Sequence, residues 1–221
     1  MKAYIFDLDG TLLDSMGIWQ DIDIEFLRKR NIPIPADYSD SISALSFPEA
    51  AAYTINRFGL PDSRDDLMSE WSNMAVYAYS HTVKLKPYAR DYLLALRESG
   101  VKLAVATSAT PELYIPALKN NGIYDLFHII CSADEVGHGK SRPDIFLHTA
   151  NKLAVSPCDC IMFEDLLVAV KSAKSIGMTV YGVYDKASED DWEQIKLVAD
   201  GTITDFRNAP LPGDGGTMHG G

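Results

Sequence analysis

The order of hydrophobic and polar residues predicts an α/β region over the second half of the chain. From residue 84 onward, short apolar segments alternate with amphipathic segments of about ten residues. We predict strands at residues 101–106, 127–131, 160–163, 178–183 and 202–203, and helices at 88–98, 110–122, 143–153, 166–175 and 192–198. This alternation is typical of a parallel sheet that is covered by helices on both faces. Residues 2–6 are also short and apolar, and we expect them to supply one more buried strand.

Residues 15–83 show helical periodicity and no convincing strand pattern. Ile18, Ile22 and Phe26 recur every four residues. A second apolar stripe at helical spacing consists of Leu67, Trp71, Met74, Ala75 and Ala78. The predicted fold is therefore a doubly wound, Rossmann-like parallel sheet core formed by residues 1–14 and 84–207, with an all-helical cap domain inserted at 15–83.

The C-terminal residues 208–221 have little to bury. They contain five Gly and two Pro. We expect this segment to be a disordered tail.

Composition and charge narrow the class of protein. The chain has 221 residues, 47% of them hydrophobic and 23% charged, with a net charge of −11. These are globular values, and the absence of a Lys/Arg run argues against nucleic acid or an anionic membrane as the partner. No apolar run approaches the ~18 residues of a membrane span, and residue 1 leads directly into the first predicted strand. The three cysteines suggest no disulfide framework, so we expect a cytoplasmic protein.

Polar residues that can carry chemistry gather where the predicted strands end. They are Asp7, Asp9, Thr107, Ser108, Lys140, Glu164 and Asp165, with Lys140 in the turn before the helix at 143. Each alone has an ordinary explanation, such as a helix cap, a solvated lysine or an exposed turn. In doubly wound sheets, however, ligands bind beyond the carboxyl ends of the strands, so these side chains are expected to share one edge.

Four carboxylates in one crevice would resist joint ionisation. A hard divalent cation removes this conflict, and Mg²⁺ binds through one or two carboxylates while it keeps waters and substrate oxygens. Together with Lys140, such a cation would form a positive centre suited to a phosphate group.

Four segments in this order resemble the haloacid dehalogenase-like superfamily, in particular its Mg²⁺-dependent phosphatases with a helical cap inserted after the first motif. The segments are 7–15 (DLDGTLLDS), 105–108 (VATS), 140–146 (KSRPDIF) and 163–165 (FED). The resemblance covers nearly all of residues 1–207, and the first motif is highly specific.

The resemblance implies a role for each matching residue. Asp7 would be the nucleophile that forms an aspartyl-phosphate, and Asp9 the general acid and base. Thr107 and Ser108 would bind the transferring phosphoryl group, and Lys140 would neutralise its charge. The metal ligands would be Asp7, the Asp9 backbone carbonyl and Asp165, with Glu164 acting through water.

Two positions depart from the family pattern. Leu166 stands where the fourth motif usually has Ser, which removes a hydroxyl near a metal ligand. Tyr88 follows Pro87 where relatives often have Gly, and we expect a local change of packing there.

The inserted helices are expected to select the substrate. Trp19 and Phe47 are the predicted substrate contacts, and Asp23, Tyr77 and His81 are further candidates, although aromatic residues at helical spacing more often belong to a core. Related sugar-phosphate mutases hold a second phosphate with a cap Arg, and residues 43–47 contain none.

We therefore predict a phosphatase that acts with Mg²⁺ on a small phosphate ester, such as a sugar phosphate, in a protein that is a monomer or weak dimer. The alternatives are a hexose-phosphate mutase of the beta-phosphoglucomutase type, a receiver-like domain, and an inactive phosphate-binding module.

Overall fold

The computed structural model describes residues 2–43, 45 and 47–213, and the chain divides into two compact units. The sheet unit comprises Met1–Ser15 and Lys84–Gly221, and the helical unit comprises Met16–Val83. Among the described residues, no helix is both long and apolar enough to cross a membrane.

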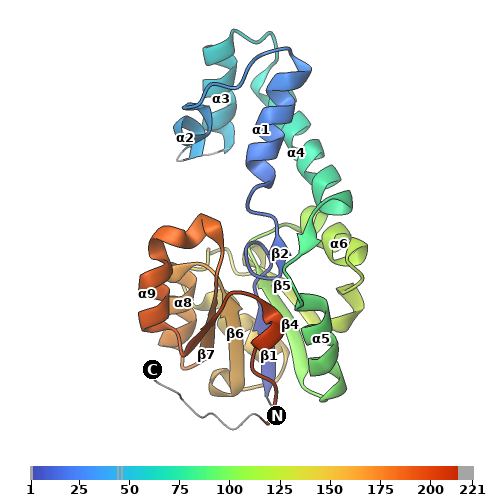
Figure 1. Cartoon of the computed structure of the whole chain (residues 1–221), viewed down its shortest axis with the longest axis vertical. Helices are drawn as coiled ribbons and strands as arrows, with labels where there is room; N and C mark the ends of the chain where they lie inside the picture. The colour runs from blue at the N-terminus through green and yellow to red at the C-terminus, as the bar shows by residue number, and fades with distance from the viewer. Residues whose placement is uncertain (1, 44, 46, 214–221) are drawn as a thin grey trace. The chain divides into compact units, whose positions relative to one another are not determined.

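The sheet unit is built on six parallel strands in the order β5-β4-β1-β6-β7-β8 (Figure 1). In chain order they are β1 (Ala3–Phe6), β4 (Lys102–Thr107), β5 (Ile129–Ser132), β6 (Cys160–Glu164), β7 (Thr179–Val183) and β8 (Gly201–Ile203). β1 pairs with β4 on one side and β6 on the other, so the chain order of the strands reverses around β1. Such a reversal is where doubly wound sheets bind ligands.

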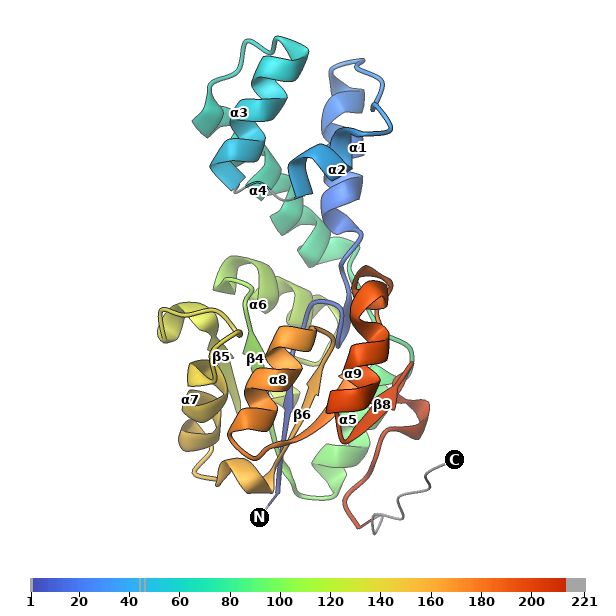
Figure 2. The ribbon, with the colours of Figure 1, turned by 90° about the vertical axis from the view of Figure 1, so that its left-hand side faces the viewer.

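Helices cover both faces of this sheet. On one face, α7 (Asp144–Lys152), α8 (Leu167–Ser175) and α9 (Trp192–Val198) contribute side chains to the same buried cluster as β1, β4 and β6, and Figure 2 shows these helices in front of the strands. The opposite face is aromatic: the rings of Phe6 and Phe163 stack 5.0 Å apart, and Tyr92 from α5 (Ala89–Glu98) lies 5.8 Å from Phe163. Helix α6 (Pro111–Asn120) connects β4 to η1 (Tyr124–Leu126) and β5.

The helical unit contains α1 (Ile18–Lys29), α2 (Tyr38–Ser43), α3 (Phe47–Phe58) and α4 (Arg64–His81). Its core includes Phe26 and Trp71, whose rings lie 5.6 Å apart in an edge-to-face arrangement. Ser63 caps α4 by accepting a hydrogen bond from the backbone N–H of Asp66. The apolar stripes at residues 18–26 and 67–78 therefore correspond to helices that bury most of these side chains, namely Ile22, Phe26, Leu67, Trp71 and Ala75, while the others are half-buried.

The predicted fold class is confirmed: a parallel sheet covered by helices is accompanied by a set of inserted helices. Several short elements were not predicted. They are α2, the antiparallel pair β2 (Leu13–Asp14) and β3 (Lys84–Leu85), and the 3₁₀ segments η1, η2 (Ala133–Glu135), η3 (Pro157–Asp159), η4 (Lys186–Asp191) and η5 (Phe206–Asn208). A two-residue strand, or a helical segment of three to six residues, is too short to show the repeat of an amphipathic helix or the alternation of a strand.

The predicted start of the disordered tail at residue 208 is wrong. Asn208 ends η5, Ala209 is buried, and the Pro210 carbonyl accepts a 2.6 Å hydrogen bond from the Tyr92 hydroxyl. These contacts depend on partners more than a hundred residues away, which the local composition does not reveal. The part of the predicted tail at 214–221 lies outside the described residues.

Tyr88 adopts a backbone conformation that glycine adopts more easily, and relatives often have Gly at this position. Its φ is +63°, in the left-handed region that residues with a Cβ rarely adopt. The tyrosine ring contacts Arg207, whose guanidinium lies 4.4 Å from the ring centroid and donates a hydrogen bond to the Tyr88 hydroxyl.

Candidate active site

The turn that follows β1 positions the first carboxylate. The Asp7 N–H donates to the Phe163 carbonyl at 3.0 Å, which continues the pairing of β1 with β6 past the end of the strand. Gly10 then has a φ of +82°, and a Cβ at this residue would lie 2.4 Å from Asp165 Oδ2. Only glycine fits both the turn and this close approach of Asp165.

Asp7, Glu164 and Asp165 form a buried carboxylate cluster, with one oxygen from each residue lying within 4.8 Å of the others. Their exposed fractions are 4%, 0% and 0%. Lys140 is also buried, and its ammonium donates to Asp7 Oδ1 and, at 2.8 Å, to Glu164 Oε2. Three carboxylates and one ammonium leave two uncompensated negative charges when all are ionised. The cluster can therefore hold a divalent metal ion.

Burial and mutual repulsion shift the ionisation of this cluster. Burial, with the neighbouring charges of Glu164 and Asp165, raises the pKa of Asp7 well above its usual range, although Lys140 opposes this. Burial and Glu164 raise the pKa of Asp165 to about 7. Burial alone would lower the pKa of Lys140, but the charges of Asp7 and Glu164 raise it overall, so Lys140 stays protonated.

Hydrogen bonds orient the two carboxylates that follow β6. Glu164 Oε1 accepts from the backbone N–H groups of Asp165 and Leu166, both at 3.1 Å. The Thr11 hydroxyl donates to Asp165 Oδ1 at 2.9 Å, and the Ser188 hydroxyl donates to Oδ2 at 3.4 Å. Two hydroxyl groups from segments distant in the sequence thus bond to Asp165, the residue before Leu166. Sequence reasoning missed both residues, because nothing local signals such a contact.

We predict that Thr11→Val weakens divalent cation binding by about 10–100-fold, because groups that orient metal ligands have effects of this size. The substitution keeps the side-chain volume but removes the shorter of the two hydrogen bonds to Asp165. Loss of this bond also raises the pKa of Asp165 further above about 7. Calorimetric titration with Mg²⁺ at several pH values measures both effects.

Ser188→Ala is the matched comparison, and its longer hydrogen bond implies a smaller loss of affinity. Equal effects of the two substitutions, or no effect of Thr11→Val, would contradict the assigned roles.

Asp9 lies outside the cluster of three side chains. Its Oδ1 accepts a 2.5 Å hydrogen bond from the Ser15 hydroxyl. Ser15, which we placed in the helical region, therefore belongs to the sheet unit instead. The expected metal ligand at residue 9 is a backbone carbonyl, which leaves the side chain available for proton transfer, and this assignment stays a prediction.

The remaining predicted site residues lie on other elements. Thr107 is buried at the end of β4, where its Oγ1 accepts from the Ala109 N–H at 3.0 Å, and Ser108 is exposed. Trp19 and Phe47 belong to the helical unit, where their rings lie 5.7 Å apart, and Trp19 is 43% exposed.

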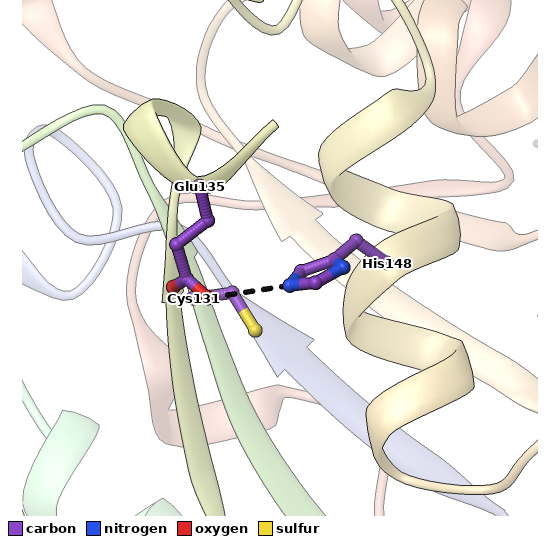
Figure 3. Close-up of side chains that lie close together, drawn as sticks. All are labelled: Cys131, Glu135 and His148. Carbon is purple, nitrogen blue, oxygen red and sulfur yellow. Dashed lines mark hydrogen bonds and ion pairs between the residues drawn. The ribbon is translucent and has the colours of Figure 1, made fainter. Parts of the chain in front are cut away.

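A second group of possible metal ligands contains Cys131, Glu135 and His148 (Figure 3). The Glu135 carboxylate is already paired, because it accepts from the Ser132 N–H at 2.9 Å, from Lys152 at 2.5 Å and from His148 Nε2 at 3.2 Å. Burial raises the pKa of the Cys131 thiol, which disfavours the thiolate that a metal needs. The hydrogen bonds and ion pairs of Glu135 connect β5, η2 and α7, and they explain why these side chains lie close together.

Comparison with known proteins assigns the chain to a family. Residues 1–177 match the haloacid dehalogenase-like hydrolases. The chain belongs to this family. The four motifs noted in the sequence all lie within the matched residues.

Named relatives of this haloacid dehalogenase-like chain include several phosphatases. A phosphorylated carbohydrates phosphatase of Thermotoga maritima is 27% identical over 83% of this chain and 85% of its own length. The beta-phosphoglucomutase of Bacillus subtilis is 30% identical over 83% of each chain. A bifunctional riboflavin kinase/FMN phosphatase of Arabidopsis thaliana is 31% identical over 82% of this chain, which spans only 48% of that relative.

Solved structures of the family share this fold. The crystal structure of a candidate beta-phosphoglucomutase from Thermotoga maritima superposes with a TM-score of 0.81, covering 92% of this chain and 94% of that one at 24% identity. The prediction of a haloacid dehalogenase-like hydrolase with phosphatase relatives is confirmed, and it weighs against a receiver-like domain.

Proposed function

We propose that the protein is a Mg²⁺-dependent phosphatase that hydrolyses the phosphomonoester of a small sugar-like metabolite. The observation that supports this most strongly is the contact between buried Asp7 and Lys140 within the carboxylate cluster. A paired carboxylate at the switch point of the sheet is a suitable nucleophile toward phosphorus.

The donor set fits Mg²⁺. It consists of carboxylate oxygens. When all three carboxylates are ionised, Lys140 compensates one of their three negative charges, and two remain. Because the cluster is buried, water screens these charges little. Asp7, Asp165 and the Asp9 backbone carbonyl would hold the ion, with Glu164 acting through water. When bound, the ion supplies positive charge that neutralises the phosphate oxygens.

The proposed reaction has two steps. A carboxylate oxygen of Asp7 forms a bond to phosphorus while the bond from phosphorus to the ester oxygen breaks, and the departing alcohol takes a proton from Asp9. Water then attacks the phosphorus of the aspartyl-phosphate and gives its proton to Asp9, which releases inorganic phosphate and restores Asp7.

The other site residues hold the phosphoryl group during both steps. Lys140 orients Asp7 through its hydrogen bond and places an ammonium beside the incoming phosphate. Thr107 and Ser108, after β4, would donate hydrogen bonds to phosphoryl oxygens. Such positioning and charge neutralisation account for most of the catalysis in phosphoryl transfer.

We assign small hydroxylated phosphate esters as the substrate class. Relatives whose names state a substrate include an FMN phosphatase, a phosphorylated carbohydrates phosphatase and a (DL)-glycerol-3-phosphatase. Trp19 and Phe47 are the proposed contacts to the organic part of the substrate. Location in the cytoplasm and a monomeric or weakly dimeric state stay predictions.

A panel of phosphomonoesters tests the proposal. We expect Mg²⁺-dependent release of inorganic phosphate from at least one sugar or polyol phosphate, measured by a colorimetric phosphate assay. Absence of release from the whole panel, or release that persists in excess chelator, would contradict it.

A second candidate is a hexose-phosphate mutase, which the beta-phosphoglucomutase of Bacillus subtilis supports at 30% identity. A mutase must hold a sugar bisphosphate, and the absence of Arg from residues 43–47 argues against this reading. Isomerisation that depends on added sugar bisphosphate, with no net phosphate release, would identify a mutase.

A further inference from the structure

Lys86 and Asp185 form a largely buried ion pair at the carboxyl edge of the sheet, outside the carboxylate cluster. The Lys86 ammonium donates to Asp185 Oδ2 at 2.5 Å, and the two side chains are 12% and 5% exposed. Lys86 follows β3, and Asp185 lies just after β7, the strand that pairs with β6. Because removing two charges from water costs about as much free energy as their attraction returns, stability alone does not explain this pair.

The other oxygen of the Asp185 carboxylate fixes the start of η4. Asp185 Oδ1 accepts from the Ala187 N–H at 2.8 Å, and the Asp185 carbonyl accepts from the Ser188 N–H at 3.1 Å. Ser188 is 8% exposed, and its hydroxyl donates to Asp165 Oδ2. The position of this hydroxyl therefore depends on how the Asp185 carboxylate is held, and Lys86 holds that carboxylate by its second oxygen.

The backbone of Lys86 connects to the loop that orients Asp165 through its other oxygen. The Lys86 N–H donates to the Leu12 carbonyl at 2.8 Å, and Leu12 is fully buried. Leu12 follows Thr11, whose hydroxyl donates to Asp165 Oδ1 at 2.9 Å. Both oxygens of Asp165 thus receive hydroxyl groups from segments that Lys86 joins, one through its backbone and the other through its ammonium.

We propose that Lys86 and Asp185 are positioning residues for the metal ligand Asp165, and that their ion pair acts through Ser188. The inference rests on the proposed Mg²⁺ site. The pair keeps η4 in the conformation that directs the Ser188 hydroxyl to Asp165 Oδ2, and this hydrogen bond helps to fix the direction of the Asp165 carboxylate. Mg²⁺ requires near-ideal octahedral geometry, whereas Ca²⁺ tolerates irregular arrangements of its oxygen ligands. Loss of the pair should therefore weaken Mg²⁺ binding more than Ca²⁺ binding.

Calorimetric titration of the metal-free protein with Mg²⁺ and with Ca²⁺ tests this selectivity. Lys86→Met keeps the aliphatic stem but removes the ammonium. We expect its Kd for Mg²⁺ to rise by about 3–10-fold, the effect of losing one hydrogen bond to a group that orients a metal ligand. Its Kd for Ca²⁺ should rise by less than about twofold. A general loosening of the fold would weaken both ions alike, so the ratio of the two Kd values separates positioning from a structural role. Asp165→Asn removes the ligand and identifies the heat that belongs to this site.

A double-mutant cycle tests whether the ion pair acts through Ser188. Ser188→Ala should raise the Kd for Mg²⁺ by about the same factor as Lys86→Met. Adding Lys86→Met to Ser188→Ala should then change this Kd by less than about twofold, because the hydroxyl that the ammonium positions is already absent. Independent losses that multiply would mean that Lys86 acts by another route, and would overturn the proposal.

Lys86→Met leaves a buried Asp185 without its cation, which destabilises the fold, and a second variant avoids this effect. Lys86→Met/Asp185→Asn removes both charges together, while the Asn oxygen can still accept from the Ala187 N–H. This double variant should show the same selective loss of Mg²⁺ affinity. Lys86→Arg keeps the cation and should bind Mg²⁺ within about twofold of the wild type. Lys196→Met is the matched control, because it removes an ammonium from an exposed ion pair with Glu193 at 2.6 Å, and it should leave both Kd values unchanged.

The ¹³C resonance of the Asp165 side-chain carboxyl gives a readout that needs no metal. Its absence from the spectrum of Asp165→Asn assigns it. At a fixed pH, Ser188→Ala and Lys86→Met should move it in the same direction, and Lys196→Met should leave it in place. If the wild type binds no Mg²⁺, the proposed metal site fails, and this resonance decides the positioning role separately. An unmoved resonance in Lys86→Met, an unchanged Kd for Mg²⁺, or equal losses of Mg²⁺ and Ca²⁺ affinity would each overturn the proposal.

Discussion

Asp7→Asn is expected to abolish phosphate release, with kcat reduced by at least about 10⁴-fold. The amide has nearly the same shape as the carboxylate but is a very poor nucleophile, so no aspartyl-phosphate can form. The substitution also removes one charge from a buried cluster in which Lys140 pairs with both Asp7 and Glu164. The fold should therefore persist, and phosphate release under saturating substrate and Mg²⁺ measures the loss.

Asp91→Asn is the matched control, because it makes the same chemical change at an exposed position on α5. It should retain wild-type activity. Mass spectrometry of acid-quenched wild-type enzyme should find a phosphoryl group on the peptide that contains Asp7, and the Asn variant should lack it. Substantial Mg²⁺-dependent activity in Asp7→Asn would exclude this residue as the nucleophile.

The carboxylate cluster was predictable because parallel strands align their carboxyl ends. β1 and β6 are neighbours in the sheet, so Asp7 and the pair Glu164-Asp165 must meet at one edge. Lys140 was assigned to this edge from its position in the turn before α7, and the resemblance to the family then implied its role. Its contacts with Asp7 and Glu164 place it in the cluster.

The supporting contacts were not predictable, because they join segments far apart in the sequence. Thr11 reaches Asp165 across 154 positions, and Ser188 reaches it from η4. The neighbours of Asp23 are also set by tertiary packing: the periodicity of α1 identifies Ile22 and Phe26 as buried, but it gives no sign that an adjacent carboxyl is buried with them. Sequence patterns thus located the elements and the reacting groups, while the environment of each group required the structure.

Removal of divalent cations is the second change with a large expected effect, since chelation should abolish phosphate release and restoring Mg²⁺ should recover it. The binding of Mg²⁺ should also stabilise the fold. At a concentration of about 100 times Kd, the free energy of unfolding rises by about 2.7 kcal/mol, which corresponds to a Tm increase of roughly 5–10 °C for a chain of this size.

The increase in Tm caused by Mg²⁺ should depend on pH, and the raised pKa values of the clustered carboxyl groups set the direction of that dependence. The pKa values of Asp7 and Asp165 are raised in the folded protein, that of Asp165 to about 7. The contribution of Asp165 to stability is therefore fully present below its ordinary pKa, near 3.8, and is lost as the pH rises through about 7, and the contribution of Asp7 changes in the same direction. Mg²⁺ binds the ionised carboxylates and must displace protons at lower pH, so its stabilising effect should be larger near pH 8 than near pH 5.

The difference in Tm with and without Mg²⁺, measured across this range, isolates the cluster from the other titrating groups, because their contributions cancel. Asp165→Asn removes one of the three clustered carboxylates and should lose most of the Mg²⁺ effect at every pH, whereas Asp91→Asn should keep it. A Mg²⁺ effect that is constant with pH, or larger near pH 5, would mean that the ion binds elsewhere. The pH dependence therefore tests the location of the metal as well as its requirement, because it follows from the burial of Asp7 and Asp165.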